Sequence, residues 1–171
     1  MQRKICIRDA CSDDTADLMA INRGASPGVS YLDASGAKSL VSIASLAWVA
    51  VICGQVVGYL IGFLPGSSYD GDEFLWFKHR GGSFIYVDQI AIAQNFRGCG
   101  IGRQLYAELA RWSSANTCCT ITCEVNLIPP NPGSLAFHAA AGFAEVGHLD
   151  CADNRRVVLL ERRLRCDGLG V

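Results

Sequence analysis

The strongest constraint on the fold of this chain is a sequence of three elements. A buried strand leads through a glycine-rich turn into an amphipathic helix. Residues 84–92 (FIYVDQIAI) are apolar on both faces apart from Asp88 and Gln89, and strands of that kind lie in a sheet that helices cover on both sides. The turn over residues 94–102 (QNFRGCGIG) follows at once. Apolar residues then recur at helical spacing, at Ile101, Leu105, Leu109 and Trp112. The segment therefore predicts an α/β protein in which helices flank a central sheet.

The rest of the chain has the pattern of one mixed α/β domain that spans residues 1–171. A length of 171 residues suits a single domain. Further strands are expected near residues 4–8, 46–53, 56–64, 119–125, 144–148 and 156–164. Helices are expected after Ser12, near residues 34–44, behind the glycine turn, and from Asn131 to Gly142. Residues 65–83 are expected to form a long loop that needs a function or some structure of its own.

The apolar run of residues 43–64 allows two interpretations. Its length is close to that of a membrane-spanning helix, but Gly54-Gln55 interrupts it, and both halves are rich in β-branched and aromatic residues. That interruption is typical of a tight hairpin between two buried strands. We therefore expect a hairpin and no membrane association.

The nine cysteines are expected to be reduced thiols of a cytoplasmic protein. Their number is odd, no two form a CxxC pair, and the N-terminal MQRKICIRDA does not resemble a signal peptide. Cys118 and Cys119 are adjacent and so point to opposite faces of a strand, and no pair of ligands has zinc spacing. We expect no metal. A formal net charge of −1 also argues against a dedicated nucleic-acid binder, which needs a basic excess.

The glycine-rich turn has the chemistry of a phosphate site. Backbone N–H groups gather at the start of a helix, and the helix dipole favours an anion there. The dinucleotide pattern GxGxxG fails because Arg103 stands at the third glycine position, and no GK[ST] follows as a P-loop requires. What remains is Arg97-x-x-Gly100-x-Gly102 behind a buried strand.

Two motifs in this chain resemble those of the GNAT superfamily of acyl-CoA N-acyltransferases. The first is residues 97–102, which match the family's R/Q-x-x-G-x-G/A loop. The second, Asn131-x-x-Ser134-x-x-Phe137-His138-x-x-x-Gly142-Phe143, is similar to N-x-x-A/S-x-x-F/L-Y-x-x-x-G-F. The order of elements agrees from about residue 4 to residue 164. The resemblance implies the GNAT-type fold, a central, mostly antiparallel mixed sheet flanked by helices on both faces. Residues 84–92, the CEVN segment and the YDGDEFLWF segment also look like a small bacterial subgroup of unassigned substrate.

The resemblance implies acetyl-CoA as co-substrate and a set of residues that bind it. Backbone N–H groups of residues 97–102 would hold the pyrophosphate, and the end of the strand before them would align the pantetheine arm. Arg97 and Arg103 either add charge at the phosphates or are solvated surface residues. The full set is Ile90, Ala91, Ile92, Arg97, Gly98, Cys99, Gly100, Ile101, Gly102, Arg103, Asn131 and Ser134.

Two side chains are the expected catalytic residues, Asp88 and His138. Asp88 is the one carboxylate of an apolar strand, so it is either a base with a pKa raised by burial or a structural carboxylate. Glu124 is a weaker candidate for the base. His138 stands where many relatives carry a tyrosine that protonates the leaving thiolate, and it is an acid, a base or a packing residue. A covalent route through Cys99 is less favoured, because nothing in the sequence pairs it with a base.

The function that follows from the resemblance is transfer of an acetyl group from acetyl-CoA to a primary amine by direct attack in a ternary complex. The alternatives are a non-catalytic acyl-CoA-binding or sensor domain and an interaction module with a vestigial loop. Asp70, Asp72 and Glu73 beside three aromatic residues form either an acidic lid that favours a cationic amine or a solvated loop. The acceptor amine stays open, and so does the oligomeric state, with a homodimer among the options.

Overall fold

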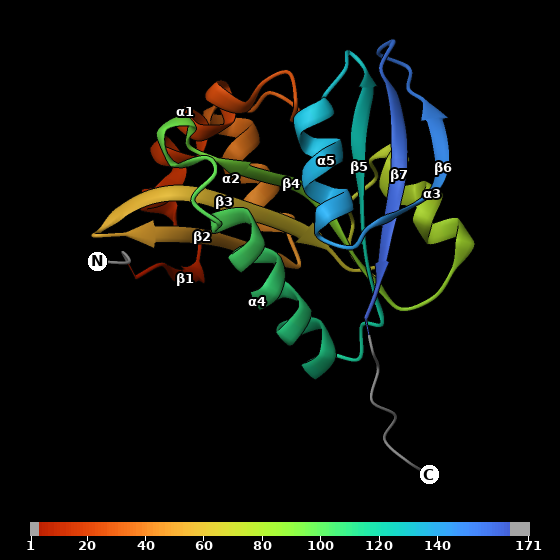
Figure 1. Ribbon diagram of the computed structural model, residues 1–171, viewed down its shortest axis with the longest axis horizontal. Coiled ribbons are helices and arrows are strands. Elements are labelled where there is room, and N and C mark those ends of the chain that lie inside the picture. The colour runs from red at the N-terminus through yellow and green to blue at the C-terminus, as the bar shows by residue number, and fades with distance from the viewer. Residues whose placement is uncertain (1–3, 165–171) are drawn as a thin grey trace.

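All seven strands join one sheet in the computed structural model, which describes residues 4–164. The strands are β1 (Cys6–Asp9), β2 (Leu46–Ile52), β3 (Gln55–Phe63), β4 (Phe84–Ile92), β5 (Thr120–Ile128), β6 (Ala144–Asp150) and β7 (Arg156–Arg163). Their order in the sheet is β1-β2-β3-β4-β5-β7-β6. The pair β4–β5 is parallel and the others are antiparallel. This is the mixed, mostly antiparallel sheet that was expected (Figure 1).

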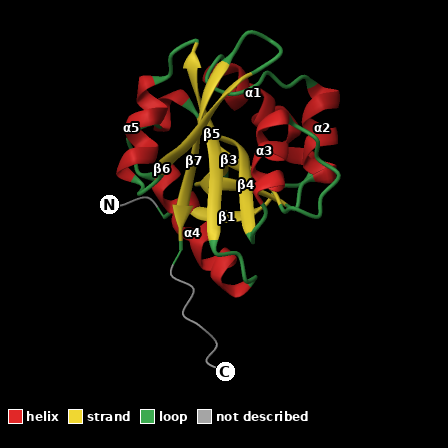
Figure 2. Cartoon of the chain, turned by 90° about the vertical axis from the view of Figure 1, so that its right-hand side faces the viewer, coloured by secondary structure: helices red, strands yellow, loops and turns green. Residues whose placement is uncertain are grey.

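Within residues 4–164, five helices cover both faces of the sheet. They are α1 (Thr15–Ala25), α2 (Ala34–Ile43), α3 (Asp72–Arg80), α4 (Ile101–Ala115) and α5 (Pro132–Ala140), with short 3-10 turns η1 (Ser12–Asp14) and η2 (Gln94–Phe96). Apolar side chains of α4 and α5 pack into one core cluster, and those of α1, α2 and α3 pack into a second. Figure 2 shows α5 and α3 on opposite sides of the strands. The sheet therefore has two buried faces, which explains why its strands read as continuous apolar runs.

The long apolar run is a hairpin, as predicted. Cys53 and Gly54 form its two-residue turn, with φ values of 50° and 81°, and positive φ at both positions is the requirement of a type I′ turn. The turn lies one residue earlier than the Gly54-Gln55 pair expected from the sequence, because Gln55 already begins β3. Within residues 4–164, no helix is long and apolar enough to cross a membrane.

The segment expected to be a loop and possible acidic lid contains helix α3. Phe74 and Phe77 are buried in the second core cluster, and Glu73 is buried against Arg155 with an N–O distance of 2.9 Å. The interpretation as a solvated loop or lid is therefore wrong for these residues. Two signals in the sequence DEFLWFKHR indicate a helix. Phe74 and Phe77 are spaced to lie on one helix face, and the order of acidic residues first and basic residues last complements the helix dipole.

Most of the described cysteines are free thiols, as expected, but Cys119 is disulfide-bonded. The expectation of reduced thiols is wrong at this position. Cys118 and Cys123 are buried fillers, whereas Cys99 in the glycine turn is exposed.

Strands β4 and β5 separate after a short stretch of pairing. Their parallel register begins at Phe84 and Thr120 and ends at Val87 and Cys123, although β4 continues to Ile92 and β5 to Ile128. Beyond residue 87, β4 pairs only with β3 among the described strands. The edge of β4 that faces β5 therefore presents backbone groups to a gap in the sheet (Figure 1).

Candidate active site

A cavity of ≈ 300 Å³ opens where β4 and β5 separate. Four parts of the chain line it: the facing ends of β4 and β5, one side of α5, the loop between α1 and α2 (residues 26–33, the α1–α2 loop), and the turn between β6 and β7. Its polar or ionisable lining includes Asp88, Glu124, Asn126, Ser134, His138, Asp153 and Arg155. The two residues expected to be catalytic therefore share one cavity with Glu124.

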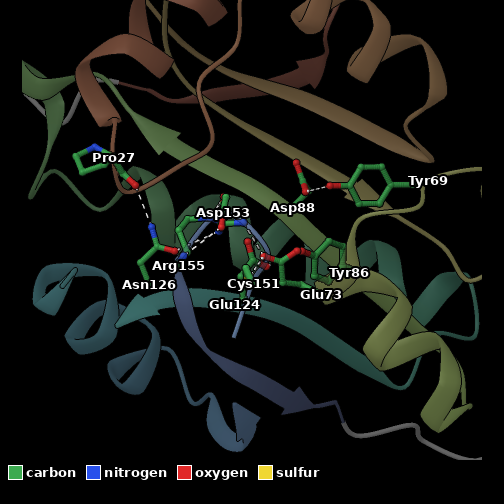
Figure 3. A network of polar contacts seen from close by, with 10 residues as sticks. All are labelled: Pro27, Tyr69, Glu73, Tyr86, Asp88, Glu124, Asn126, Cys151, Asp153 and Arg155. Atoms are coloured by element: carbon green, nitrogen blue, oxygen red, sulfur yellow. Dashed lines mark hydrogen bonds and ion pairs between the residues drawn. The ribbon is translucent and has the colours of Figure 1, made fainter. Parts of the chain in front are cut away.

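Asp88 and Glu124 are the first residues after the last β4–β5 pair, so they face the gap from its two sides. Each carboxylate accepts a hydrogen bond from a tyrosine hydroxyl. Tyr69 donates to Asp88 Oδ1, and Tyr86 donates to Glu124 Oε2 at 2.6 Å (Figure 3). In the part of the chain that the structure describes, neither carboxylate forms an ion pair with lysine or arginine.

The two carboxyl groups bind protons more tightly than ordinary carboxyl groups do. Burial raises the pKa of Asp88 to about 6, against the opposing effect of the Tyr69 hydrogen bond. Burial, and after it the charge of Asp88, raises the pKa of Glu124 well above its usual range. A carboxylate whose pKa lies close to neutral pH is suited to accept a proton from an amine.

His138 lies in the wall of the cavity with both ring nitrogens engaged. Nδ1 is 2.8 Å from the backbone oxygen of Ser134, and Nε2 is 2.8 Å from the Tyr106 hydroxyl. Because a carbonyl oxygen only accepts, Nδ1 carries the proton and Nε2 accepts from Tyr106. Burial lowers the pKa of His138, so the ring is neutral at neutral pH.

The glycine turn has the conformation that its sequence predicted. Gly98 and Gly100 have φ values of 76° and 79°, a region that side chains disfavour, and Gly100 is the N-cap of α4. Gly102 is needed for another reason, since a Cβ there would lie 2.9 Å from the ring of Phe137. The first N–H groups of α4 have no partner within the helix and are available to an anion.

Of the remaining expected cofactor residues, Ile90 and Ser134 line the cavity. Ile90, Ala91 and Ile92 pair with β3 on one side, which leaves the other side of this strand end to the gap. Asn131 caps α5, its Oδ1 accepting from the N–H of Ser134 at 3.2 Å. Arg103 and Cys99 are exposed. The Arg97 guanidinium instead donates to two backbone oxygens, Gly24 O at 2.9 Å and Ile92 O at 3.3 Å.

The structure adds partners that the sequence analysis did not identify. Asn126 donates to Pro27 O at 2.9 Å and accepts from Arg155 at 3.3 Å, and Arg155 continues to Glu73 (Figure 3). Tyr86 lies on a strand that the sequence predicted, but its bond to Glu124 depends on the pairing of β4 with β5, which no local pattern encodes. Tyr69 lies in an irregular segment and gave no such signal. Among residues 4–164, no group of three or more His, Cys, Asp or Glu side chains is placed to hold a metal ion.

Solved structures with the same fold are numerous, although their sequence identity is low. Ard1 from Thermoplasma volcanium aligns with a TM-score of 0.75 at 16% identity, over 94% of this chain and 97% of that one. A ribosomal-protein-alanine N-acetyltransferase from Brucella melitensis has a TM-score of 0.71 at 24% identity, over 93% and 99%. Arabidopsis thaliana NAA60 in complex with acetyl-CoA has a TM-score of 0.72 at 17% identity, over 94% and 100%. At these identities the likeness establishes the fold.

Sequence comparison supplies the family. Among curated protein sequences, no significant match was found. The profile of the Acetyltransferase (GNAT) family matches residues 24–143, a span that includes the glycine turn, both strands at the gap and helix α5. The match covers more than half of the chain and agrees with the fold, so this protein belongs to the GNAT family of acetyltransferases.

Proposed function

We propose that this protein is an acetyl-CoA-dependent N-acetyltransferase formed by a single domain over residues 1–171. The observation that carries the proposal is the position of Asp88, a carboxylate with its pKa raised to about 6, beside the gap between β4 and β5. An amine acceptor needs such a group, because an ammonium ion has no lone pair with which to attack a thioester.

Acetyl-CoA is proposed to lie between the glycine turn and the cavity. The N–H groups of residues 97–102 would bind the pyrophosphate at the start of α4, and the free edge of residues 90–92 would pair with the pantetheine arm. Asn131 and Ser134 face this arm from α5. A backbone N–H at the end of β4 would polarise the thioester carbonyl. The similarly folded NAA60 forms a complex with acetyl-CoA, which supports the choice of acetyl-CoA as co-substrate.

In the proposed reaction, the amine nitrogen attacks the thioester carbon and the C–S bond of acetyl-CoA breaks. Asp88 accepts the proton that the nitrogen loses, directly or through water, and the CoA sulfur leaves as a thiolate that must gain a proton. His138 is the proposed donor to that sulfur. Because its ring is neutral at neutral pH, it donates only after it has taken up a proton itself. The net reaction moves one proton from nitrogen to sulfur.

The charge of the cavity favours acceptors that carry no carboxylate near the amine. Asp88 and Asp153 line it, and Arg155, the one cation among the described residues of its lining, is already paired with Glu73 and Asp153. Glu124 adds a further negative charge only when it is ionised. A matched set of acceptors tests this charge preference: 1,4-diaminobutane, butylamine and 4-aminobutanoate. We expect 4-aminobutanoate to have the lowest kcat/KM of the three, and equal or higher activity would contradict the assignment.

The experiment that tests the function is a screen of small amines, peptide N-termini and lysine peptides with acetyl-CoA. Product is followed by mass, because the free cysteines of the protein react with thiol-detecting dyes. Asp88→Asn and His138→Ala are the variants, and retention of full activity in both would refute these two catalytic roles. His138→Gln can replace one of the two ring hydrogen bonds, which separates loss of packing from loss of proton transfer.

A non-catalytic acyl-CoA-binding or sensor domain is the second candidate, and the engaged nitrogens of His138 favour it. Saturating CoA at about 100 times Kd would stabilise either protein by about 2.7 kcal/mol. Only the enzyme would acetylate an amine. The cytoplasmic location and the homodimer stay predictions.

A further inference from the structure

The end of helix α1 is attached to the glycine turn by one side chain. The Nη2 of Arg97 donates to the carbonyl of Gly24 in the last turn of α1, at 2.9 Å, and its Nε donates to the carbonyl of Ile92, the last residue of β4, at 3.3 Å. Carbonyls in the last turn of a helix lack partners within it and attract cations. Arg97 therefore joins the end of a helix to the end of a strand.

The segment that follows Gly24 forms one wall of the cavity, and other residues hold it further along. Asn126 on β5 donates to Pro27 O at 2.9 Å. Asn22, which is fully buried, donates to Ser30 O at 2.9 Å and accepts from the N–H of Leu32 at 2.9 Å. Gln89 on β4 also donates to Ser30 O, at 3.3 Å. Four side chains therefore hold the α1–α2 loop: Arg97 at its start, Asn126 in its middle, and Asn22 and Gln89 near its end.

We infer that Arg97 is a positioning residue that fixes the start of the α1–α2 loop, which forms one wall of the cavity, by joining α1 to β4. That this wall contacts the acceptor amine rests on the proposed function. The sequence leaves two other roles open for this arginine, an added charge at the cofactor phosphates or a solvated surface residue. Two donors spread across a planar guanidinium reach two carbonyls at once, whereas a lysine ammonium is a compact point charge. Lysine at this position would keep the charge and lose the link.

Hydrogen exchange in the absence of cofactor tests the inference directly, because a role at the phosphates would not affect the free protein. Arg97→Lys and Arg97→Ala should both accelerate amide exchange in residues 24–32 by about tenfold, the size expected for losing hydrogen bonds from a charged donor. Arg23→Ala is the matched control. It removes the same charge from an exposed position next to Gly24 and should leave this exchange unchanged.

Parental exchange in Arg97→Ala, recovery of parental exchange in Arg97→Lys, or equal acceleration in Arg23→Ala would each overturn the inference. A second measurement compares how the Arg97→Lys variant binds its two substrates, the amine and acetyl-CoA. We expect KM for the best amine of the screen to rise about tenfold, and more than Kd for acetyl-CoA measured by calorimetry. The opposite order would make Arg97 a phosphate ligand.

The two proposals fail in different ways. If no amine is acetylated, the proposed function is wrong, while the exchange experiment still decides the role of Arg97. If amines are acetylated and the Arg97 variants exchange like the parent, the function stands and the inference falls.

Discussion

Asp88 illustrates how a single residue acquires chemistry from its position. It stands immediately after the last β4–β5 pair, where the sheet opens and the side chain faces a cavity that it shares with Glu124. The Tyr69 hydroxyl stabilises its charged form, but burial has the larger effect and raises the pKa to about 6. The same burial that costs stability keeps the group able to accept a proton near neutral pH.

Activity should therefore depend on pH through this carboxyl group. A base with its pKa raised to about 6 is protonated and inactive at lower pH, so kcat should rise with pH through that value and then level off. Asp88→Asn should lower kcat by about 10²- to 10⁴-fold and remove this limb of the profile. The measurement is kcat against pH between 5 and 9 with saturating substrates. Glu124→Gln is the comparison, and if that variant loses the limb while Asp88→Asn keeps it, Glu124 is the base.

Asp88 should also reduce the stability of the protein at high pH. Its folded pKa lies above the value of 3.8 for an unperturbed aspartate, so the fold favours the protonated form. The stabilisation is complete below the lower pKa and is lost as pH rises through about 6. Asp88→Asn should therefore raise Tm by about 2–6 °C at pH 8 and much less at pH 4. Asp70→Asn, at an exposed position, serves as control, and an equal gain at both pH values would argue against this linkage.

Individual site residues differed in how far the sequence could predict them. Asp88 was identifiable because it interrupts an apolar strand, and Gly98 and Gly100 because a phosphate turn requires their conformation. The contact from Tyr69 was not predictable, since it brings together residues 19 positions apart through an irregular segment. The hydrogen bond between His138 and Tyr106 depends on how α4 packs against α5, and no local pattern encodes that.

At the scale of elements, periodicity and turn residues predict the strands and four of the five helices in the described part of the chain, but not helix α3. Its run of charged residues is more typical of a solvated segment. In the structure, Glu73 is buried because Arg155 reaches it from the turn between β6 and β7. Local sequence patterns cannot predict a partner that lies 82 residues away in the chain.

The contact between α4 and α5 is tight enough to test with one methyl group. A Cβ at Gly102 would lie 2.9 Å from the Phe137 ring, so Gly102→Ala should destabilise the protein by about 1–3 kcal/mol. Denaturant unfolding with a fixed m-value measures this change. Gly133→Ala on α5 is the control, because a Cβ there meets no atom within 4 Å. Equal stability of the two variants would show that the ring of Phe137 moves aside freely.

At the scale of the whole molecule, Arg155 connects parts that are distant in sequence. It forms ion pairs with Glu73 of α3 and with Asp153 and a hydrogen bond with Asn126 of β5. Asn126 extends the same network to the α1–α2 loop. Helix α3, the turn between β6 and β7, strand β5 and the α1–α2 loop are therefore joined by one polar network.

Breaking this unit should cost more than losing an ordinary surface ion pair. Arg155→Ala leaves Glu73 buried without its cation and should destabilise the protein by about 2 kcal/mol, a value reduced for the partial exposure of the arginine. Thermal unfolding at pH 7 should show a decrease in Tm of about 4–8 °C. Arg156→Ala removes the neighbouring, more exposed arginine, whose carboxylate partner lies 3.6 Å away, and should change Tm by less than about 2 °C.

The glycine turn has a consequence for how such a protein can change over evolutionary time. Its proposed cofactor contacts come from main-chain groups, which every amino acid carries, so most substitutions around the turn leave those groups in place as long as Gly98 and Gly100 keep their φ values. The opposite end of the gap consists of side chains, and any replacement there alters the chemistry offered to a second substrate. The glycine turn therefore tolerates most substitutions around it, whereas substitutions at the side chains of the cavity change the site. Descendants of this protein could therefore change the amine they accept while they keep the proposed binding of acetyl-CoA.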